Sequence, residues 1–588
     1  MSIPGARRTS ERLVTTSAQA AACDRAAIAA GTPSFALMLQ AGTATASLIL
    51  REFGHCLAEG VVVLAGTGNN GGDAYVVAAQ LARAGVRVRL HAIGLPRTDD
   101  ARRASALVHA RTGFHVEIID DLDALVHGPE ALIVDGLLGT GQQGALRDVV
   151  REACGMMHAR QRAGATVLAL DVPTGLDAST GDVAEGAVRA QCTACYGTIK
   201  RGLLMQRGHA GRIVLLDIGL GAYANGVAIN DDGTATAPWR WLDAESVASR
   251  VPPIAWDAHK GRRGRVLVAG GEMGMAGAVV YAARAALMAG AGVVHTLVDT
   301  QSVTAVQSLC EAALAHRWPA LDSAAHLTPA SFALTPVGTM RPDIAVDAVA
   351  VGPGLGRSRR AGLLLQHVIA SHRSGPMVLD ADALWHAADA AQSLGIDAAM
   401  VLSHWTRDSL RESHRDADGA VPVVCTPHPG EFARLTGQPL PAAWPARAAL
   451  LQEFAQRAGV TVLLKGTPTL VASPIVPHLL VVPHGTALLA TGGSGDCLSG
   501  IIATLLAQGV SALDAAVVGA TVHGRAAELA TVRAGAVRGT TLTDLFDALP
   551  EVWRSIAASS EPAHRDSHGS VHGDSSRPPF VLAELPAL

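Results

Sequence analysis

Short apolar runs alternate with helix-length segments along two long blocks of the chain, and this alternation restricts the fold more than any other feature. The first block covers about residues 10–222 and the second about residues 244–556. Strands that are separated by helices and short loops pair in parallel through right-handed crossovers. We therefore predict two α/β domains, the first of them built on a doubly wound sheet.

The apolar runs give the expected positions of the strands, and a helix is predicted over Ala74–Ala84. The predicted strands of the first block are Val61–Ala65, Val86–Ile93, Ala131–Asp135, Thr166–Asp171 and Arg212–Asp217. Those of the second block are Arg265–Ala269, Ala348–Val351, Met377–Leu379, Val421–Thr426, Thr461–Lys465 and Thr469–Val471.

Two segments lack this alternation. Residues 221–238 are rich in Gly, Asn, Asp and Thr, which predicts a linker over about residues 223–243. The stretch from Ser559 to about Pro579 is rich in Ser, His, Asp and Pro, and we expect residues 557–588 to form a disordered tail.

Composition excludes several classes of protein. Hydrophobic residues make up 49% and charged residues 17% of the 588 residues, so most of the chain can be buried in compact layers. A net charge of −4 without a basic stripe argues against a nucleic-acid partner. The best candidate for a membrane span, Ala276–Val294, is interrupted by Arg284 and several glycines. Cys192 and Cys195 are expected to be core or surface thiols, and the protein to be a cytoplasmic homo-oligomer.

A glycine-rich turn, Gly66–Asp73, follows the first predicted strand. Its glycines allow close backbone approach to an anion, and the N-terminus of the next helix favours negative charge. The Rossmann dinucleotide fingerprint also requires an acid at the end of the next strand, but Val86–Ile93 is followed by glycine. The missing acid weakens the prediction of an ordinary dehydrogenase. The side chains of Asn69, Asn70 and Asp73, packed into the same turn, predict a ligand site in a Rossmann-like domain.

Two further strands of the first block end in aspartates, Asp135 and Asp171, each followed by a loop rich in Gly and Thr. Ligands of a doubly wound sheet bind outside the carboxyl ends of its strands. We therefore expect both aspartates to lie at the same edge of the sheet as the glycine-rich turn.

The segments GTGNNGGDAYVVA, VDGLLGTG and DVPTGLDASTGDV resemble the NAD(P)H-hydrate epimerase family over most of the first block. The resemblance implies inversion at C6 of the nicotinamide ring of hydrated NADH and NADPH (NADHX and NADPHX), with Asp171 as general acid/base or stabiliser of a ring cation. It also implies a potassium ion held by Asn70, Asp135 and Thr174. The implied substrate contacts are Asn69, Asn70, Gly71, Gly72, Asp73, Gly139, Thr140, Gly141, Gln142, Gln143, Gly144, Ala145 and Asp171.

In the second block, the segment Ala490–Asp496 (ATGGSGD) leads into an apolar helix. Its small residues expose backbone N–H groups to an anion, and Asp496 is expected to act as a catalytic base at the positive helix end. Lys465 and Gly466 end a strand and offer a positive charge and close backbone approach to a phosphate. His428 follows the end of another strand and is predicted to line the substrate site.

These motifs resemble the ribokinase-like superfamily and, within it, the ADP- or ATP-dependent NAD(P)H-hydrate dehydratases, over about residues 254–530. Further matching segments are Val351–Gly356 and Asp380–Leu384. The resemblance implies a ribokinase-like α/β domain in which the C6 hydroxyl is phosphorylated, with Mg²⁺ accompanying ADP or ATP, and phosphate is then lost. The implied nucleotide contacts are Lys465, Gly466, Thr467, Pro468, Thr469 and Gly495, and the implied hydrate contacts are Ala278, Gly354, His428 and Asp496.

Four positions depart from the two family patterns. Leu39 stands where Glu is usual, Ala74 where Gly is usual, Trp385 where Asn is usual and Arg262 where an acid or a small residue is usual. Two alternatives stay open. The second block could be a small-molecule kinase, which would accumulate a phosphorylated product, and the first block could be a non-catalytic binding module. Resemblance to other fused enzymes favours ADP over ATP.

Overall fold

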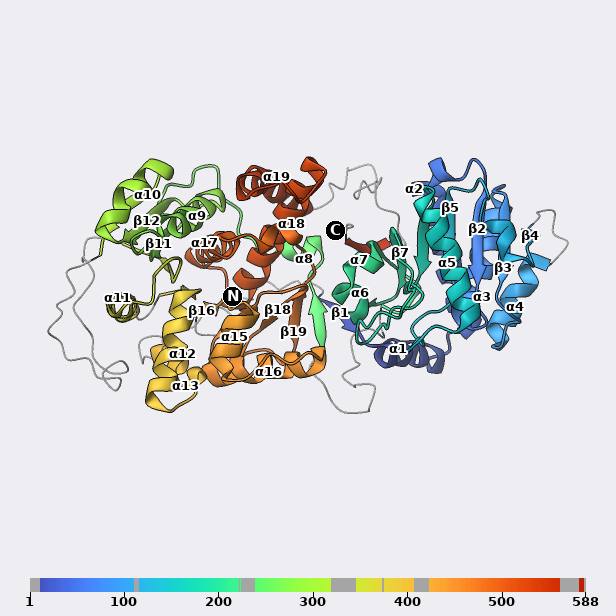
Figure 1. The fold of residues 1–588 in the computed structure, drawn as a ribbon, viewed down its shortest axis with the longest axis horizontal. Coiled ribbons are helices and arrows are strands. Elements are labelled where there is room, and N and C mark those ends of the chain that lie inside the picture. The colour runs from blue at the N-terminus through green and yellow to red at the C-terminus, as the bar shows by residue number, and fades with distance from the viewer. Residues whose placement is uncertain are drawn as a thin grey trace, which may run out of the picture. The chain divides into compact units, whose positions relative to one another are not determined.

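The chain forms two compact units in a computed structural model that describes residues 11–109, 116–221, 223, 238–318, 345–372, 375–406, 422–560 and 581–585 (Figure 1). The N-terminal unit contains the described residues of Arg12–Trp239 and Ala563–Leu588. The C-terminal unit contains those of Met1–Glu11 and Arg240–Pro562. Most of the predicted linker, residues 224–237, lies outside the described residues. The short strand β10 (Trp239–Trp241) and Asp243, which caps helix α8 (Ala244–Ala248), lie within the remainder of it.

The N-terminal unit is built on a sheet with the strand order β20-β9-β7-β6-β5-β2-β3-β4. All neighbouring pairs are parallel except β20 with β9. The order from β4 to β7 is that of a doubly wound sheet, with its switch point between β2 and β5. The strands are β2 (Val61–Ala65), β3 (Val88–Ala92), β4 (Val116–Ile118), β5 (Leu132–Gly136), β6 (Thr166–Leu170), β7 (Cys192–Tyr196), β9 (Arg212–Leu216) and β20 (Val581–Leu585).

Helices cover both faces of this sheet because successive side chains of each strand point to opposite faces. Val61 and Val63 pack with α2 and α3 in one apolar cluster, and Val62 and Leu64 pack with α5 in another. A short parallel pair, β1 (Arg12–Thr15) with β8 (Ile199–Lys200), lies outside the sheet in the same unit. The helices are α1 (Ser17–Ala29), α2 (Ser34–Glu52), α3 (Asn69–Arg83), α4 (Asp99–His109), α5 (Asp148–Arg162), α6 (Arg201–Met205) and α7 (Arg207–Ala210).

The sequence did not predict strand β7, which contains Cys192 and Cys195. The five residues of this strand, CTACY, mix small and polar side chains with apolar ones, so no apolar run marks the strand. All five are nevertheless buried. Both cysteines are free and buried, which confirms that they are core thiols.

The C-terminal unit contains a sheet in which β13-β12-β11-β14-β15-β16-β17 are parallel neighbours, and β18 and β19 continue it in antiparallel fashion. The sequence did not predict β12, β13 and β19. The strands are β11 (Arg265–Ala269), β12 (Val293–Val298), β13 (Leu314–Arg317), β14 (Ala348–Val351), β15 (Met377–Leu379), β16 (Val423–Cys425), β17 (Thr461–Leu464), β18 (Thr469–Ala472) and β19 (Leu479–Val482).

Helices α9, α17, α18 and α19 pack together and cover one face of this sheet with a large apolar cluster (Figure 1). Helix α17 approaches α9 closely at Gly500, where an added Cβ would lie 2.1 Å from the carbonyl oxygen of Ala282. The helices are α8 (Ala244–Ala248), α9 (Ala276–Met288), α10 (Val303–Leu309), α11 (Arg359–Ser371), α12 (Asp382–Leu394), α13 (Ala398–Thr406), α15 (Pro429–Thr436), α16 (Trp444–Ala458), α17 (Ser494–Ala507), α18 (Ala512–Ala534) and α19 (Leu542–Ser560).

The apolar stretch Ala276–Val294 consists of helix α9, a turn and the start of strand β12. In the part of the chain that the structure describes, no helix is both long and apolar enough to span a membrane.

The C-terminal residues return to the N-terminal unit as strand β20, which pairs with β9. Ala583 and Leu585 are buried, while Glu584 forms an ion pair with Arg212 at 2.8 Å. The prediction of a disordered tail is therefore wrong for residues 581–585, because their alternating pattern fits a sheet edge, and for residues 557–560, which extend α19. The rest of the predicted tail, 561–580 and 586–588, lies outside the described residues.

Removal of residues 581–588 should expose the edge of β9 and destabilise the N-terminal unit by about 2–4 kcal/mol, because the buried Leu and Ala side chains are lost with the strand. Hydrogen exchange followed by mass spectrometry would show faster exchange in the peptides that contain β9. Peptides from the C-terminal unit are the internal control. Unchanged exchange in β9 would contradict the pairing.

Candidate active sites

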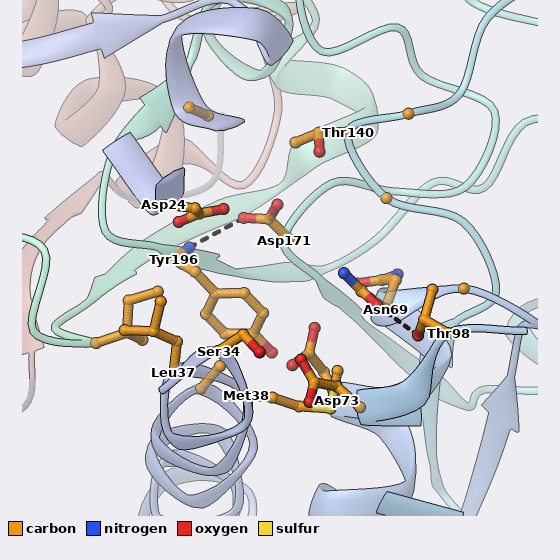
Figure 2. Close-up of a pocket in the computed structure, with 18 of the residues that line it drawn as sticks. Asp24, Ser34, Leu37, Met38, Asn69, Asp73, Thr98, Thr140, Asp171 and Tyr196 are labelled. Carbon is orange, nitrogen blue, oxygen red and sulfur yellow. Dashed lines mark hydrogen bonds between the residues drawn. The ribbon is translucent and has the colours of Figure 1, made fainter. Parts of the chain in front are cut away.

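A cavity of about 550 Å³ opens at the carboxyl edge of the N-terminal sheet, where the strands β2, β5 and β6 end (Figure 2). Helices α1 and α2, the start of α3 and the loops after β5 and β6 line it. The structure therefore brings together the three loops that the sequence analysis singled out. The lining includes the predicted residues Asn69, Asn70, Asp73, Gly139, Thr140, Gly141, Gln142 and Asp171.

Helix α3 begins at Asn69, five residues before the predicted start at Ala74, so the residues from Asn69 to Asp73 form its first turn. The prediction was wrong because glycines, which disfavour helices, are needed here for packing. An added Cβ would lie 1.8 Å from the Leu137 oxygen at Gly66, and 1.9 Å from the Gly66 oxygen at Gly71. No side chain caps the helix, so the N–H groups of its first turn stay available to a ligand.

The two glycines of this first turn do not line the cavity, although they were predicted to contact the substrate. Gly71 and Gly72 are buried, and an added Cβ at Gly72 would lie 2.5 Å from the Cε atom of Met38. They position the turn by allowing close packing. Gln143, Gly144 and Ala145 are exposed and outside the cavity lining, so their contact with substrate stays a prediction.

Asp171 is held by an ion pair with Lys200 and by a hydrogen bond from the Tyr196 backbone N–H at 3.1 Å. Its backbone has a φ of 62°, which the hydrogen bond from its N–H to the Ala194 oxygen (2.8 Å) supports. Burial alone would lower the pKa of Lys200, but the Asp171 carboxylate raises it above its usual value. Lys200 is therefore a permanent cation that fixes the Asp171 carboxylate in place.

Two more carboxyl groups face the same cavity. Figure 2 shows Asp24 close to Asp171, and Asp73 across the ring of Tyr196 from both. Burial raises the pKa of Asp73 well above its usual range, and the negative charges of Asp171 and Asp24 raise it further. The cavity thus combines a carboxylate that is paired with lysine and a carboxyl group that favours its protonated form.

Asp135 lies fully buried at the end of β5, beside this cavity. It accepts hydrogen bonds from Thr174 Oγ1 at 2.7 Å and Thr174 N at 2.9 Å, while Asn70 Nδ2 donates to the Leu138 oxygen at 2.8 Å. Burial raises the pKa of Asp135 to about 6, against the effect of its hydrogen bonds from Thr174. No cationic side chain pairs with Asp135 among the described residues, and its oxygens together with those of Asn70 and Thr174 form a donor set that suits a hard cation.

In the C-terminal unit, Asp496 is the third residue of helix α17. The helix begins after Gly493, whose φ of 94° suits glycine, and no side chain caps it. Among the described residues, the carboxylate of Asp496 has no hydrogen-bond partner. Burial raises its pKa to about 7, and the nearby Asp380 adds to this while Lys465 opposes it. Such a group can accept a proton near neutral pH.

Lys465 lies beside the same helix N-terminus, where an added Cβ at Gly495 would be 2.9 Å from its Nζ atom. It forms an ion pair with Asp380 at 2.7 Å, and Ser499 Oγ donates to the same carboxylate at 2.6 Å. Burial would lower the pKa of Lys465, but Asp380 raises it. The predicted nucleotide residues Lys465 and Gly495 are thus neighbours. Gly466, Thr467 and Pro468 lie in the adjoining connection between β17 and β18, and Thr469 is the first residue of β18.

The remaining predicted hydrate contacts fall into two places. Ala278 and Gly354 are neighbours, since an added Cβ at Gly354 would lie 3.1 Å from the Cβ of Ala278. His428 caps helix α15, where its Nδ1 accepts hydrogen bonds from the N–H groups of Gly430 (3.0 Å) and Glu431 (3.3 Å). His428 therefore has a capping role, and its contact with a substrate stays a prediction.

Comparison with known proteins covers both units. Residues 266–551 match a family model described as NAD(P)H-hydrate dehydratase, and residues 34–202 match one described as YjeF-related protein N-terminus. The bifunctional NAD(P)H-hydrate repair enzyme of Pyrobaculum aerophilum is 34% identical over 93% of this chain and 99% of its own length. The enzyme of the same name from Coxiella burnetii is 32% identical over 90% of this chain and 96% of its own.

The chain belongs to the bifunctional NAD(P)H-hydrate repair enzymes. The Escherichia coli member is 32% identical over 89% of this chain and 90% of its own length. Among solved structures, the ADP/ATP-dependent NAD(P)H-hydrate dehydratase of Bacillus subtilis, crystallised with ATP and Mg²⁺, is 25% identical. It covers 54% of this chain and 98% of its own length, with a TM-score of 0.41.

The structure shows the contacts of three residues that depart from the usual pattern of these repair enzymes. Ala74 is buried against β5, and an added Cβ at Gly136 would lie 2.5 Å from the Cβ of Ala74. Leu39 is partly buried against the apolar cluster of α2 and α3. Trp385 lies beside Arg357, whose guanidinium carbon is 5.4 Å from the centre of the indole ring.

Sequence reasoning did not assign a role to Asp24, Tyr196 or Lys200, all of which line the cavity of this repair enzyme. Tyr196 lies in β7 and Lys200 in β8, and no apolar run in the sequence indicated either strand. The signal that could have found Lys200 is a lysine in an otherwise apolar and small-residue segment, since a buried lysine requires an acidic partner.

Replacement of Lys200 by methionine should lower the free energy of unfolding of the N-terminal unit by about 3–5 kcal/mol, because Asp171 would lose its cationic partner. Hydrogen exchange in urea, read on peptides that contain β7, would measure the loss. The double variant Asp171→Asn with Lys200→Met should regain a large part of it. A single variant as stable as the wild type would show that the ion pair is absent in solution.

Proposed function

We propose that this chain repairs hydrated nicotinamide cofactors with two activities. The N-terminal unit interconverts the R and S epimers of NADHX and NADPHX, and the C-terminal unit dehydrates the S epimer to NADH or NADPH at the expense of ADP or ATP. The observation that carries the proposal is the separate, buried acidic site in each unit of a chain that belongs to this family.

Epimerisation requires the bond between C6 and the hydroxyl oxygen to break and to form again on the other face of the ring. Departure of the hydroxyl group as water needs a proton and leaves a cation delocalised over N1 and C6. Asp73, which favours its protonated form, is suited to supply that proton, and the ionised Asp171 is suited to stabilise the cation. Addition of water to the opposite face releases one proton to solvent, and Asp73 takes up a proton from solvent, so the reaction is balanced.

A potassium ion is proposed to lie among Asn70, Asp135 and Thr174. The uncompensated carboxylate of Asp135 and the all-oxygen donor set support this site. The bound ion would neutralise that carboxylate. Asn70 and Thr174, which contact the backbone of Leu138, would then hold the loop after β5 in the shape that lines the cavity.

Dehydration is proposed to proceed by phosphorylation of the C6 hydroxyl followed by elimination. Asp496 takes the hydroxyl proton, the oxygen attacks the terminal phosphate of ADP or ATP, and the bridging P–O bond breaks to release AMP or ADP. The free N–H groups of α17 and the ammonium group of Lys465 stabilise the transferring phosphate, with Mg²⁺ bound along with the nucleotide. Breaking of the C6–O bond then releases inorganic phosphate, and loss of a proton from C5 restores the dihydronicotinamide ring.

A mixture of NADHX epimers, incubated with the full chain, potassium, magnesium and ADP or ATP, should be converted completely to NADH, as measured by the absorbance of the reduced ring. Asp496→Ala should abolish recovery, because the base is lost. Asp171→Asn should leave recovery incomplete at the share of the S epimer. Accumulation of a stable phosphorylated product would instead identify the C-terminal unit as a kinase, and wild-type recovery that stops at the S share would identify a non-catalytic N-terminal unit.

The pH dependence of dehydration tests the role of Asp496. Because a base must be ionised and burial raises the pKa of Asp496 to about 7, kcat/KM should rise with pH through about 7 and level off above it. Below that value the rate should fall about tenfold per pH unit. Steady-state rates of NADH formation across the neutral range measure this profile. A profile that is flat from weakly acidic to weakly basic pH would rule out Asp496 as the base.

A further inference from the structure

A second cavity, of about 510 Å³, adjoins the first one in the N-terminal unit. Thr67, at the end of β2, lines both cavities. The second cavity otherwise lies between the loop after β3 and the start of α5. The functions proposed above do not use it. Its lining consists of Thr67, Ile93, Gly94, Leu95, Pro96, Arg97, Arg102, Arg147 and Val149.

The lining carries three arginines and, among the described residues, no acidic side chain. Arg102 is paired with Asp99, which lies outside the lining. Arg97 and Arg147 are exposed, and neither has an ion-pair partner in the described part of the chain. The Arg97 N–H donates to the Thr67 oxygen at 2.8 Å, which ties the loop after β3 to the glycine-rich turn. The cavity is therefore an electropositive site that is suited to a phosphate group.

The position of this cavity beside the end of β3 indicates which phosphate group of a dinucleotide it would bind. In a doubly wound sheet with this strand order, the pyrophosphate of a dinucleotide lies at the helix after the first strand, here α3. The adenosine ribose lies at the end of the next strand, here β3, where an acid selects a free 2′-hydroxyl and an arginine accepts a 2′-phosphate. The loop after β3 begins with Ile93–Pro96, which include no acid, and Arg97 follows them in the same loop.

We infer that Arg97 and Arg147 bind the 2′-phosphate of NADPHX, so that the N-terminal unit discriminates in favour of the phosphorylated hydrate. This inference rests on the proposed epimerase activity and deepens it. The nicotinamide end of the substrate then lies in the first cavity with Asp73 and Asp171, and Thr67 lies between the two ends. The pyrophosphate, which both hydrates contain, has the same phosphate chemistry and is the alternative occupant that the test must distinguish.

The test measures epimerisation of the pure R epimers of NADPHX and NADHX by the full chain without ADP or ATP, so that the dehydratase is silent. The variants are Arg97→Gln, Arg147→Gln and both together. Arg162→Gln is the matched control, because Arg162 is an exposed arginine in the last turn of α5 that lines neither cavity. Separation of the two epimers by chromatography gives kcat/KM for each substrate.

We expect kcat/KM for NADPHX to fall about tenfold or more with each substitution, through KM, while kcat/KM for NADHX stays unchanged. Adenosine 2′,5′-bisphosphate should inhibit the wild type competitively and the double variant much more weakly. Equal losses for both substrates would place the pyrophosphate in the cavity and overturn the inference, as would no loss for either.

Failure of the proposed function is distinguishable from these results. If the wild type epimerises neither substrate, the epimerase proposal fails. Calorimetric titration of adenosine 2′,5′-bisphosphate into the wild type and the double variant still tests the arginine site in that case. Binding that is equally tight in both would overturn the site, and binding that is weaker in the variant would support it.

Discussion

The contact between Gly66 and the backbone of Leu137 determines how the N-terminal site is assembled. An added Cβ at Gly66 would lie 1.8 Å from the Leu137 oxygen, so the turn after β2 and the loop after β5 touch backbone to backbone. This closeness lets Asn70 donate to the Leu138 oxygen and brings the first turn of α3 to the cavity. β2 and β5 flank the switch point of the sheet, so this close approach lies beside the cavity of about 550 Å³, which Leu137 lines, and beside the proposed cation site at Asp135.

The aspartates at the strand end of one unit and the helix end of the other have different electrostatic surroundings. Asp171 forms an ion pair with the buried Lys200, and its proposed role is to stabilise positive charge on the ring. Asp496 has no such partner, because Lys465 is engaged by Asp380, and burial raises the pKa of Asp496 to about 7. A group that changes protonation near neutral pH is suited to move a proton. The position of one lysine relative to each aspartate therefore distinguishes the two roles that are proposed for them.

Sequence reasoning was most successful where apolar runs are followed by glycine and acidic residues. Strand β2 and the ends of β5 and β6 were predicted closely, and these ends carry Asp135 and Asp171. Strand β7 and the start of α3 were not predicted, since small and glycine-rich segments carry no periodic signal and their conformation is set by packing with distant segments. Lys200 was overlooked for the same reason: its role depends on a partner 29 residues away in the chain.

Strand β20 has a consequence for how the protein is made. The N-terminal sheet receives its edge strand from residues 581–585, which leave the ribosome after every other residue of both sheets has been synthesised. Until then β9 presents an unpaired edge, a surface that readily pairs with other extended chains. The first sheet to be translated is thus the last to be completed. Its assembly is linked to the synthesis of the entire polypeptide, so that the sheet is closed only in molecules that also carry the C-terminal unit.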